Sequence, residues 1–142
     1  MGEMAHTELL AEVRFSADAT RLKLVRAFVR DASSFAGCSA EVAEQIVIAV
    51  NEGCMNVIQH AYKGDDSRDI VLRISRVGTD VVFRLIDFAE PSDFTEIKPR
   101  ALGDIRPGGL GTHFMSELMD ECIFGHLERK QGNFVDLKKK IA

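Results

Sequence analysis

The sequence predicts an α+β fold, a two-layer sandwich in which helices cover one face of a mixed, mostly antiparallel sheet. Apolar residues alternate with polar ones in several short segments, recur at helical spacing in two long ones, and are separated by turn residues. The resulting order is strand, two helices, two strands, loop, short helix, two strands. Because strands this short cannot bury both faces alone, helices should cover one face of the sheet.

The first half of the chain predicts one strand followed by a pair of helices. Residues 11–15 alternate as in a half-buried strand. Asp18 is placed to cap a helix that Gly37 ends, and Ser39 opens the next one. Residues 41–62 read as one long helical stretch. Its apolar positions form a single stripe: Ile46, Val50, Gly53, Cys54, Val57 and Ala61.

A hairpin and a long loop follow these helices. Strands are expected at residues 70–77 and 81–88, around the tight turn at 78–80. Residues 89–107 hold all three prolines of the chain and show no clear periodicity. A loop of this length in a compact domain is usually functional or mobile.

The end of the chain predicts a short helix at residues 110–119 and a last hairpin of residues 122–127 and 134–141. No internal repeat or low-complexity segment interrupts this order. The length of the chain therefore favours one domain over residues 1–142.

Composition and charge argue against several classes of protein. The formal charge is −4, with both signs spread along the chain, whereas a nucleic-acid binder usually needs a dense basic face. No apolar run approaches the roughly 20 residues that span a bilayer, and no signal peptide is recognisable. The three cysteines are odd in number and far apart, which argues against a metal cluster or disulfide framework. We expect a cytoplasmic protein that contacts neither nucleic acid nor membrane directly.

Three polar residues recur at a spacing of four on the second predicted helix: Glu52, Asn56 and His60. This spacing stacks them on one side, at the edge of the apolar stripe. Glu52 could take a proton from a hydroxyl or water, and Asn56 offers Mg²⁺ a neutral oxygen. A solvated polar face explains the same three residues. His60 is expected near the site as a helix-end residue.

A glycine-rich segment precedes the short helix; we call it the glycine loop. Glycines let backbone N–H groups approach an anion, and a helix N-terminus adds favourable partial charge. A hinge with a helix cap is the alternative, and neither a Walker loop nor a Rossmann fingerprint is present. The predicted phosphate-binding residues are Gly108, Gly109, Leu110, Gly111 and Thr112.

Asp87 ends an apolar strand and begins the long loop. A carboxylate at the end of a strand beside a ligand site can accept a hydrogen bond from an exocyclic amine. A turn aspartate that ends the strand is the alternative interpretation.

Together, these features resemble the GHKL (Bergerat-fold) ATPases, and more closely the anti-sigma factor serine kinases of the RsbW and SpoIIAB type. Residues 51–62 read NEGCMNVIQHAY, which looks like that family's N box: a Glu, an Asn four residues on, and a His-Ala-Tyr ending. Residues 108–114 read GGLGTHF and precede LMDE at 118–121, which is similar to its second glycine box. Gly132 and Asn133, before the last strand, also fit. The match in element order covers nearly the whole chain.

The resemblance implies a role for each candidate residue. Glu52 would be the catalytic base, Asn56 the Mg²⁺ ligand, and Asp87 the acceptor for the adenine amino group. The glycine loop would hold the phosphates of ATP. Residues 89–107 would form the ATP lid, from which Arg106 would reach a phosphate or remain solvated.

One box departs from the family pattern. After Asp87, the family usually has Gly two positions on, whereas this chain has Ala89 and then Pro91. The Ala89 methyl can still fit against a purine, but it narrows the approach and limits positive φ. Pro91 fixes its own φ and removes a hydrogen-bond donor.

The resemblance implies an ATP- and Mg²⁺-dependent serine/threonine protein kinase that is also an anti-sigma factor. It would bind a sigma factor and phosphorylate an anti-anti-sigma (STAS-type) protein. A nucleotide-sensing switch that binds partners without kinase activity is the alternative, and a stand-alone ATPase is a third. A homodimer is also expected. An apolar face on the first helix near Leu22 and Phe28 would suit one, although core packing explains these residues equally well.

Overall fold

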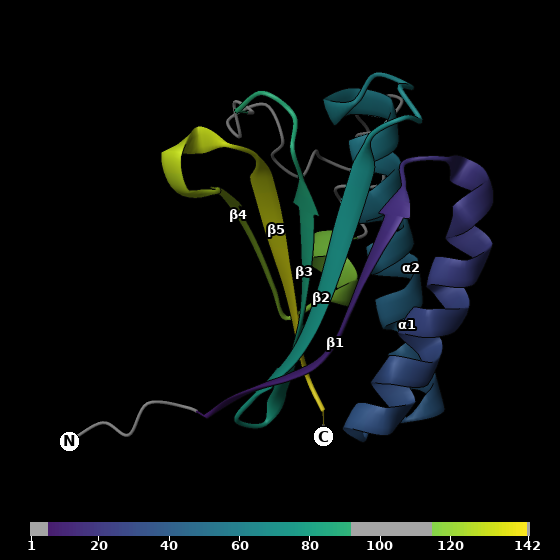
Figure 1. The fold of residues 1–142 in the computed structure, drawn as a ribbon. Coiled ribbons are helices and arrows are strands. Elements are labelled where there is room, and N and C mark those ends of the chain that lie inside the picture. The colour runs from purple at the N-terminus through teal and green to yellow at the C-terminus, as the bar shows by residue number, and fades with distance from the viewer. Residues whose placement is uncertain (1–5, 92–114, 142) are drawn as a thin grey trace.

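A five-stranded sheet forms one layer of the molecule and helices form the other, as Figure 1 shows. The computed structural model describes residues 6–91 and 115–141. The strands lie in the order β1-β2-β3-β5-β4. They are β1 (Thr7–Ser16), β2 (Asp69–Val77), β3 (Asp80–Asp87), β4 (Glu121–His126) and β5 (Asn133–Lys140). The predicted α+β sandwich is confirmed.

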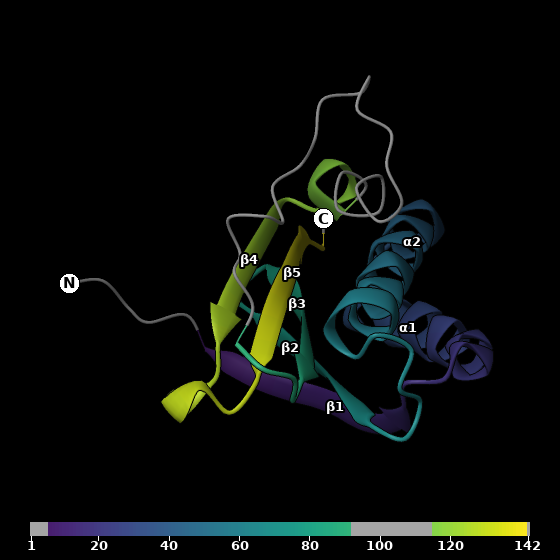
Figure 2. The same cartoon turned by 90° about the horizontal axis from the view of Figure 1, so that it is seen from above.

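The helical layer lies on one face of the sheet. Figure 2 shows α1, α2 and the short helix at residues 115–118 on that same face. The helical elements before β2 are η1 (Ala19–Arg21), α1 (Leu22–Ala36), α2 (Ala40–Asn56) and the π-helical segment η2 (Val57–Ala61). A short 3₁₀ turn, η4 (Glu128–Lys130), joins β4 to β5. Residues 110–114 of the predicted helix lie outside the described residues, and Met119 follows the end of the helix.

All four strand pairings in the described part of the chain are antiparallel, so no parallel pair makes this sheet mixed. Two helices separate β1 from β2. Because the chain reverses direction after each of these elements, β2 runs opposite to β1. β3 and β4 do run in the same direction. However, β5 lies between them and pairs antiparallel with both.

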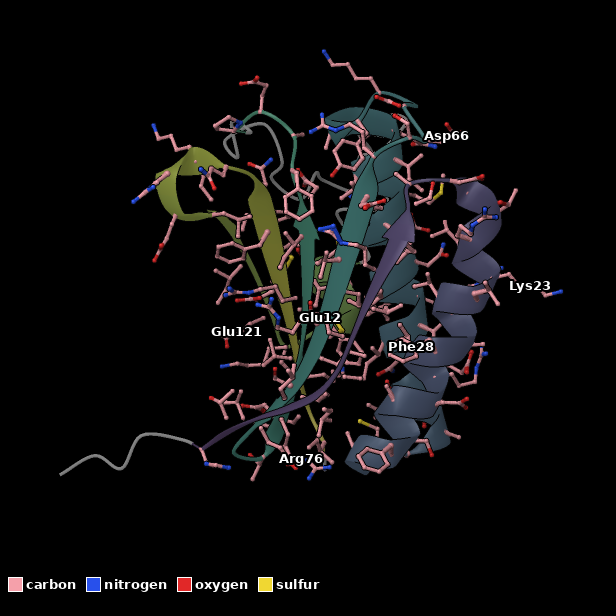
Figure 3. The ribbon with its side chains drawn as sticks, viewed as in Figure 1. Glu12, Lys23, Phe28, Asp66, Arg76 and Glu121 are labelled. Carbon is pink, nitrogen blue, oxygen red and sulfur yellow. The ribbon has the colours of Figure 1, made fainter. Side chains whose placement is uncertain are left out.

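The core lies between the sheet and the helices. It is formed by alternate residues of the central strands, such as Leu72, Phe83 and Leu137, against the apolar faces of α1 and α2. The other face of the sheet carries cross-strand ion pairs, among them Glu12 with Arg73 at 3.0 Å. Figure 3 shows Glu12 on the side of β1 that is turned away from the helices. This is the pattern of a sheet with one buried and one solvated face.

The predicted helix boundaries in the first half are largely confirmed. The Asp18 side chain accepts the Thr20 N–H at 2.9 Å, which caps the 3₁₀ turn η1 immediately before α1. Gly37 ends α1 with a left-handed φ of +109°. Ser39 Oγ accepts the Val42 N–H at 3.2 Å at the start of α2.

The long helix predicted for residues 41–62 changes geometry before its end. α2 stops at Asn56, and the π turn η2 follows, closed by the Tyr62 N–H donating to the Val57 carbonyl at 2.8 Å. In an α-helix Tyr62 would lie about 140° around the axis from Val57. The wider π turn instead places residue i+5 below residue i, so Tyr62 joins the buried face and is only 4% exposed.

Core packing accounts for the apolar residues of α1 that were considered for a homodimer. Leu22 is 3% exposed and belongs to the core, so it is not part of an exposed face. Phe28 is half-buried against the same core, on the side of α1 that faces β1 in Figure 3. The large apolar residues of α1 that are exposed are Leu24 and Phe35 instead. Within the described residues, no helix is long and apolar enough to cross a membrane.

Candidate functional site

The polar row on α2 lies at the border of the buried face, as predicted. Glu52 and Asn56 are half-buried, and Gly53 beside them is buried. A Cβ added to Gly53 would lie 3.1 Å from Leu85 Cδ2 and 3.4 Å from Met115 Sδ. Gly53 therefore lets α2 approach both β3 and the helix at residues 115–118 closely, next to the two functional candidates.

His60 differs from the other two residues of this row. It lies in the π turn η2 and is exposed, whereas Glu52 and Asn56 are half-buried. The half-buried members of the predicted row are therefore Glu52 and Asn56.

The glycine loop lies outside the described residues, and so do Arg106 and most of the predicted lid. The described chain resumes at Met115, which is 1% exposed and packs beside Gly53. At the other end of that short helix, Lys139 Nζ donates to the Leu118 carbonyl at 2.6 Å. The helix that follows the glycine loop is therefore anchored to α2 at one end and to β5 at the other. The loop residues without a described position are Gly108, Gly109, Leu110, Gly111 and Thr112.

Asp87 is a buried carboxylate at the end of β3, only 6% exposed. Its Oδ1 accepts the Ala89 N–H at 3.0 Å and the Asn133 side-chain amide at 2.9 Å. Burial raises the pKa of Asp87, and the hydrogen bonds from Asn133 and Ala89 oppose that rise. The bond to Ala89 is the local bond of a turn aspartate, so both sequence interpretations apply. Both hydrogen bonds that the described residues make to this carboxylate reach Oδ1, so Oδ2 is the oxygen that could accept a hydrogen bond from a ligand amine.

The start of β5 is packed tightly against this carboxylate. Asn133 is 3% exposed and also donates to the Glu90 carbonyl at 3.1 Å. A Cβ added to Gly132 would lie 2.3 Å from the Asp87 carbonyl oxygen. Only glycine therefore permits this approach of β5 to β3.

Ala89 fits this arrangement without the freedom of glycine. It is 7% exposed and belongs to the core, and it is not among the residues with positive φ. Its methyl group therefore adds no backbone strain, which removes one of the two concerns raised by the altered box. The described segment ends at Pro91, which is exposed.

Two residues without an assigned role in the sequence complete this end of the site. The Tyr62 hydroxyl accepts the Phe88 N–H at 2.8 Å and donates to the Asp69 carbonyl at 2.5 Å. The Arg68 guanidinium donates to the Phe88 carbonyl at 2.6 Å and lies over the Tyr62 ring. Tyr62 ends the helix motif and was visible there, whereas Arg68 lies in a turn-rich stretch that offers no signal.

The donor atoms present suit Mg²⁺ that enters with phosphates. Among the described residues, no three His, Cys, Asp or Glu side chains lie together to hold a metal ion. Mg²⁺ does not require such a cage, because it keeps several waters and usually binds through few protein oxygens together with substrate phosphates. The amide oxygen of Asn56 is a hard donor of the required kind.

Comparison with known proteins gives a consistent result. Residues 15–139 match the family described as histidine kinase-like ATPase domain. The serine-protein kinase RsbW of Bacillus pumilus is 31% identical over 129 residues, which cover 83% of this chain and 79% of that protein. RsbW of Bacillus subtilis is 29% identical over 119 residues, covering 78% and 74%.

A solved structure shares the fold. It contains the RsbU and RsbW domains of a Mycobacterium tuberculosis protein and superposes with a TM-score of 0.63 at 20% identity. The match covers 93% of this chain but only 33% of that longer one. At this identity the likeness concerns the fold alone.

Proposed function

This chain belongs to the histidine kinase-like ATPase domain family, and from that premise we propose that it is an ATP-dependent serine/threonine protein kinase with an anti-sigma role. One observation carries the proposal. Glu52 and Asn56 are half-buried on a helix, and Tyr62, at the end of that helix, is hydrogen-bonded to Phe88, the residue after the buried carboxylate of Asp87. The relatives named serine-protein kinase support the reaction class.

In the proposed reaction, each described residue has one task. Glu52 takes the proton of the attacking serine hydroxyl. The oxygen of that hydroxyl forms a bond to the γ-phosphorus, and the bond between the γ-phosphorus and ADP breaks. Asn56 would hold Mg²⁺ through its amide oxygen, and the ion would supply positive charge against the negative charge that develops on the phosphates. Asp87 Oδ2 accepts the adenine amine, while the bonds from Asn133 and Ala89 keep Oδ1 occupied.

The residues outside the described part of the chain belong to the proposal as well. The glycine loop, Gly108 to Thr112, would bind the phosphates through its backbone N–H groups. The remainder of the predicted lid, including Arg106, would close over them. The whole chain would act as one ATP-binding domain in the cytoplasm.

The proposed partners are proteins. The phosphoryl acceptor is a serine of a STAS-type anti-anti-sigma protein, and the sequestered partner is a sigma factor. A second copy of the chain is a further proposed partner. These assignments follow from the resemblance to the RsbW and SpoIIAB type.

The direct test is phosphoryl transfer to a protein. The purified chain is incubated with Mg-ATP and a STAS-type antagonist domain, and both proteins are weighed by mass spectrometry. We expect the antagonist domain to gain one phosphoryl group, and no gain when ADP replaces ATP. ATP hydrolysis without protein phosphorylation would instead identify a stand-alone ATPase.

A nucleotide-sensing switch without kinase activity is the second candidate. Ala89, where the family usually has glycine, and Pro91 soon after it favour this candidate, because they change the segment beside the proposed adenine site. In the same assay such a protein would bind ATP and its partner but transfer no phosphate. The two half-buried polar residues on α2, Glu52 and Asn56, favour the kinase.

A further inference from the structure

The backbone of Phe88 is held at both of its polar groups by side chains. Its N–H donates to the Tyr62 hydroxyl at 2.8 Å, and its carbonyl accepts the Arg68 guanidinium at 2.6 Å. Phe88 lies between Asp87, which carries the proposed adenine acceptor, and Ala89, whose N–H is bonded to that acceptor. A loop residue normally leaves such groups to water. Here side chains of the fold hold both groups and fix the position of the segment.

Tyr62 reaches Phe88 because of the π turn. The turn moves Tyr62 onto the buried face of the helix, where its ring is 4% exposed and its hydroxyl bridges the start of β2 and the end of β3. The same helix carries Glu52 and Asn56 within the three turns before Tyr62. π turns within helices often occur at functional sites. A continuous element thus connects the catalytic row to the strand end that carries Asp87.

We propose that Tyr62 and Arg68 are positioning residues of the nucleotide site, which hold the Phe88 backbone so that Asp87 meets the adenine amine in one fixed orientation. The inference rests on the proposed function, because it assigns Asp87 to adenine. Tyr62 also sets the distance between the adenine end of the site and the helix that carries Glu52. We call Tyr62 and Arg68, bonded to the Phe88 backbone, the clamp. Selectivity for adenine therefore depends on this clamp as well as on Asp87.

The test compares two nucleotides that differ at the adenine amine. Inosine triphosphate has the sugar and phosphates of ATP but a keto oxygen in place of the amine. The dissociation constants of Mg-ATP and Mg-ITP are measured by displacement of a fluorescent nucleotide from the wild-type chain and its variants. Tyr62→Phe removes only the hydroxyl, and Arg68→Met removes the guanidinium but keeps much of the apolar stem.

A matched control is available in Arg14. Its guanidinium lies 5.3 Å from the centroid of the Phe88 ring, so it contacts the side chain of the same residue. The hydrogen bond described for it goes to Asp69, not to the Phe88 backbone. Arg14→Met therefore removes a contact to the Phe88 side chain but keeps both hydrogen bonds to the Phe88 backbone. Thermal unfolding of each variant confirms that it is folded.

We expect Tyr62→Phe and Arg68→Met to weaken ATP binding about three- to tenfold, the range for one lost hydrogen bond, and to leave ITP binding unchanged. The preference for ATP then shrinks by the same factor, while Arg14→Met retains it. An equal loss for both nucleotides, or no loss for either, would overturn the inference, because a merely structural role predicts those results.

The wild-type chain separates this inference from the proposed function. If it binds ATP and ITP equally, Asp87 does not select adenine and the clamp has no such role, while phosphate binding stands. If it binds no nucleotide, the proposed function is wrong and the inference falls with it.

Discussion

The two ends of the proposed nucleotide site are built differently. At the adenine end, the three side chains of Asp87, Asn133 and Tyr62 are between 3% and 6% exposed, and each forms hydrogen bonds. At the phosphate end, Glu52 and Asn56 are half-buried on the surface of α2. Buried polar groups require partners, and each of these three residues has at least one within the fold.

This difference separates recognition from chemistry. A preorganised acceptor such as Asp87 does not have to be ordered when the ligand binds, which favours selectivity. The catalytic end must admit phosphates, Mg²⁺ and a protein serine, and half-buried groups remain accessible to them. Changes at Glu52 should therefore affect turnover, whereas changes around Asp87 should affect binding and stability. The following predictions test that division, beginning with the largest effect.

Glu52→Gln should abolish most phosphoryl transfer and leave ATP binding intact. Removing a general base typically costs about 10²- to 10⁴-fold in rate, and the neutral amide keeps the shape of the side chain. Glu44→Gln is the matched control, because Glu44 is on the same helix but is exposed and paired with Arg30. Transfer is followed by mass spectrometry and binding by calorimetry. Full phosphorylation by Glu52→Gln would remove the catalytic role.

Asp87→Asn should weaken ATP binding by about 10- to 100-fold, the range for a hydrogen bond to a charged group. The variant should fold, because the amide oxygen can still accept from Ala89 and Asn133. Asp136→Asn, which breaks the ion pair with Arg84 on the open face of the sheet, is the control and should not alter ATP affinity. Calorimetry with Mg-ATP measures both variants. Unchanged affinity in Asp87→Asn would assign adenine recognition elsewhere.

Gly132→Ala should lower both stability and ATP affinity. Its Cβ would lie 2.3 Å from the Asp87 carbonyl oxygen, and backbone cannot move aside as a side chain can. Overpacking of this kind costs about 1–3 kcal/mol. Gly64→Ala is the control: Gly64 also has positive φ, but a Cβ there meets nothing within 4 Å. It should show only the conformational cost, about 1–2 kcal/mol, and normal ATP binding. Urea unfolding compares the two, and equal losses would contradict the tight contact.

The stability of the chain should depend weakly on the protonation of Asp87. Burial raises its pKa in the folded state above the ordinary value of 3.8. The folded state therefore binds this proton more tightly than the unfolded state does. Its contribution to the free energy of unfolding is complete below pH 3.8 and is lost as pH rises through the raised pKa.

The Asp87→Asn variant has no carboxyl group to protonate at this position, so it serves as the reference. The free energy of unfolding of the wild-type chain, relative to that of Asp87→Asn, should decrease as pH rises from about 4 towards neutrality. Urea unfolding at a series of pH values measures the difference. A difference that is constant, or that increases with pH, would show that burial does not raise the pKa of Asp87.

Most of the local structure was predictable because its causes are local. The cap at Ser39 and the left-handed Gly37 require only the few residues around them. The strand at residues 81–88 was expected from its apolar run, and β3 spans Asp80–Asp87. The π turn was not predicted, because the same apolar stripe suits an α-helix and a helix that widens after Asn56.

The candidate site was predicted unevenly. Glu52, Asn56 and Asp87 were predicted from residue type, spacing and the family resemblance, and the structure places Asp87 in a buried, hydrogen-bonded position. The bonds of Tyr62 and Arg68 to the Phe88 backbone join residues 20 or more positions apart in the chain. No local pattern encodes such a contact.

The sequence by itself determined the fold class, the helix caps and the motifs that resemble the family's nucleotide-binding boxes; the roles of the residues in those motifs stay predictions. These depend on periodicity, turn chemistry and short motifs, which involve only residues that are close together in the sequence. Only the tertiary structure decided that His60 is exposed, that Tyr62 enters the core, and that Gly132 lies against Asp87. The positions of Tyr62 and Gly132 follow from close packing between segments that are distant in the chain, which no local sequence pattern encodes.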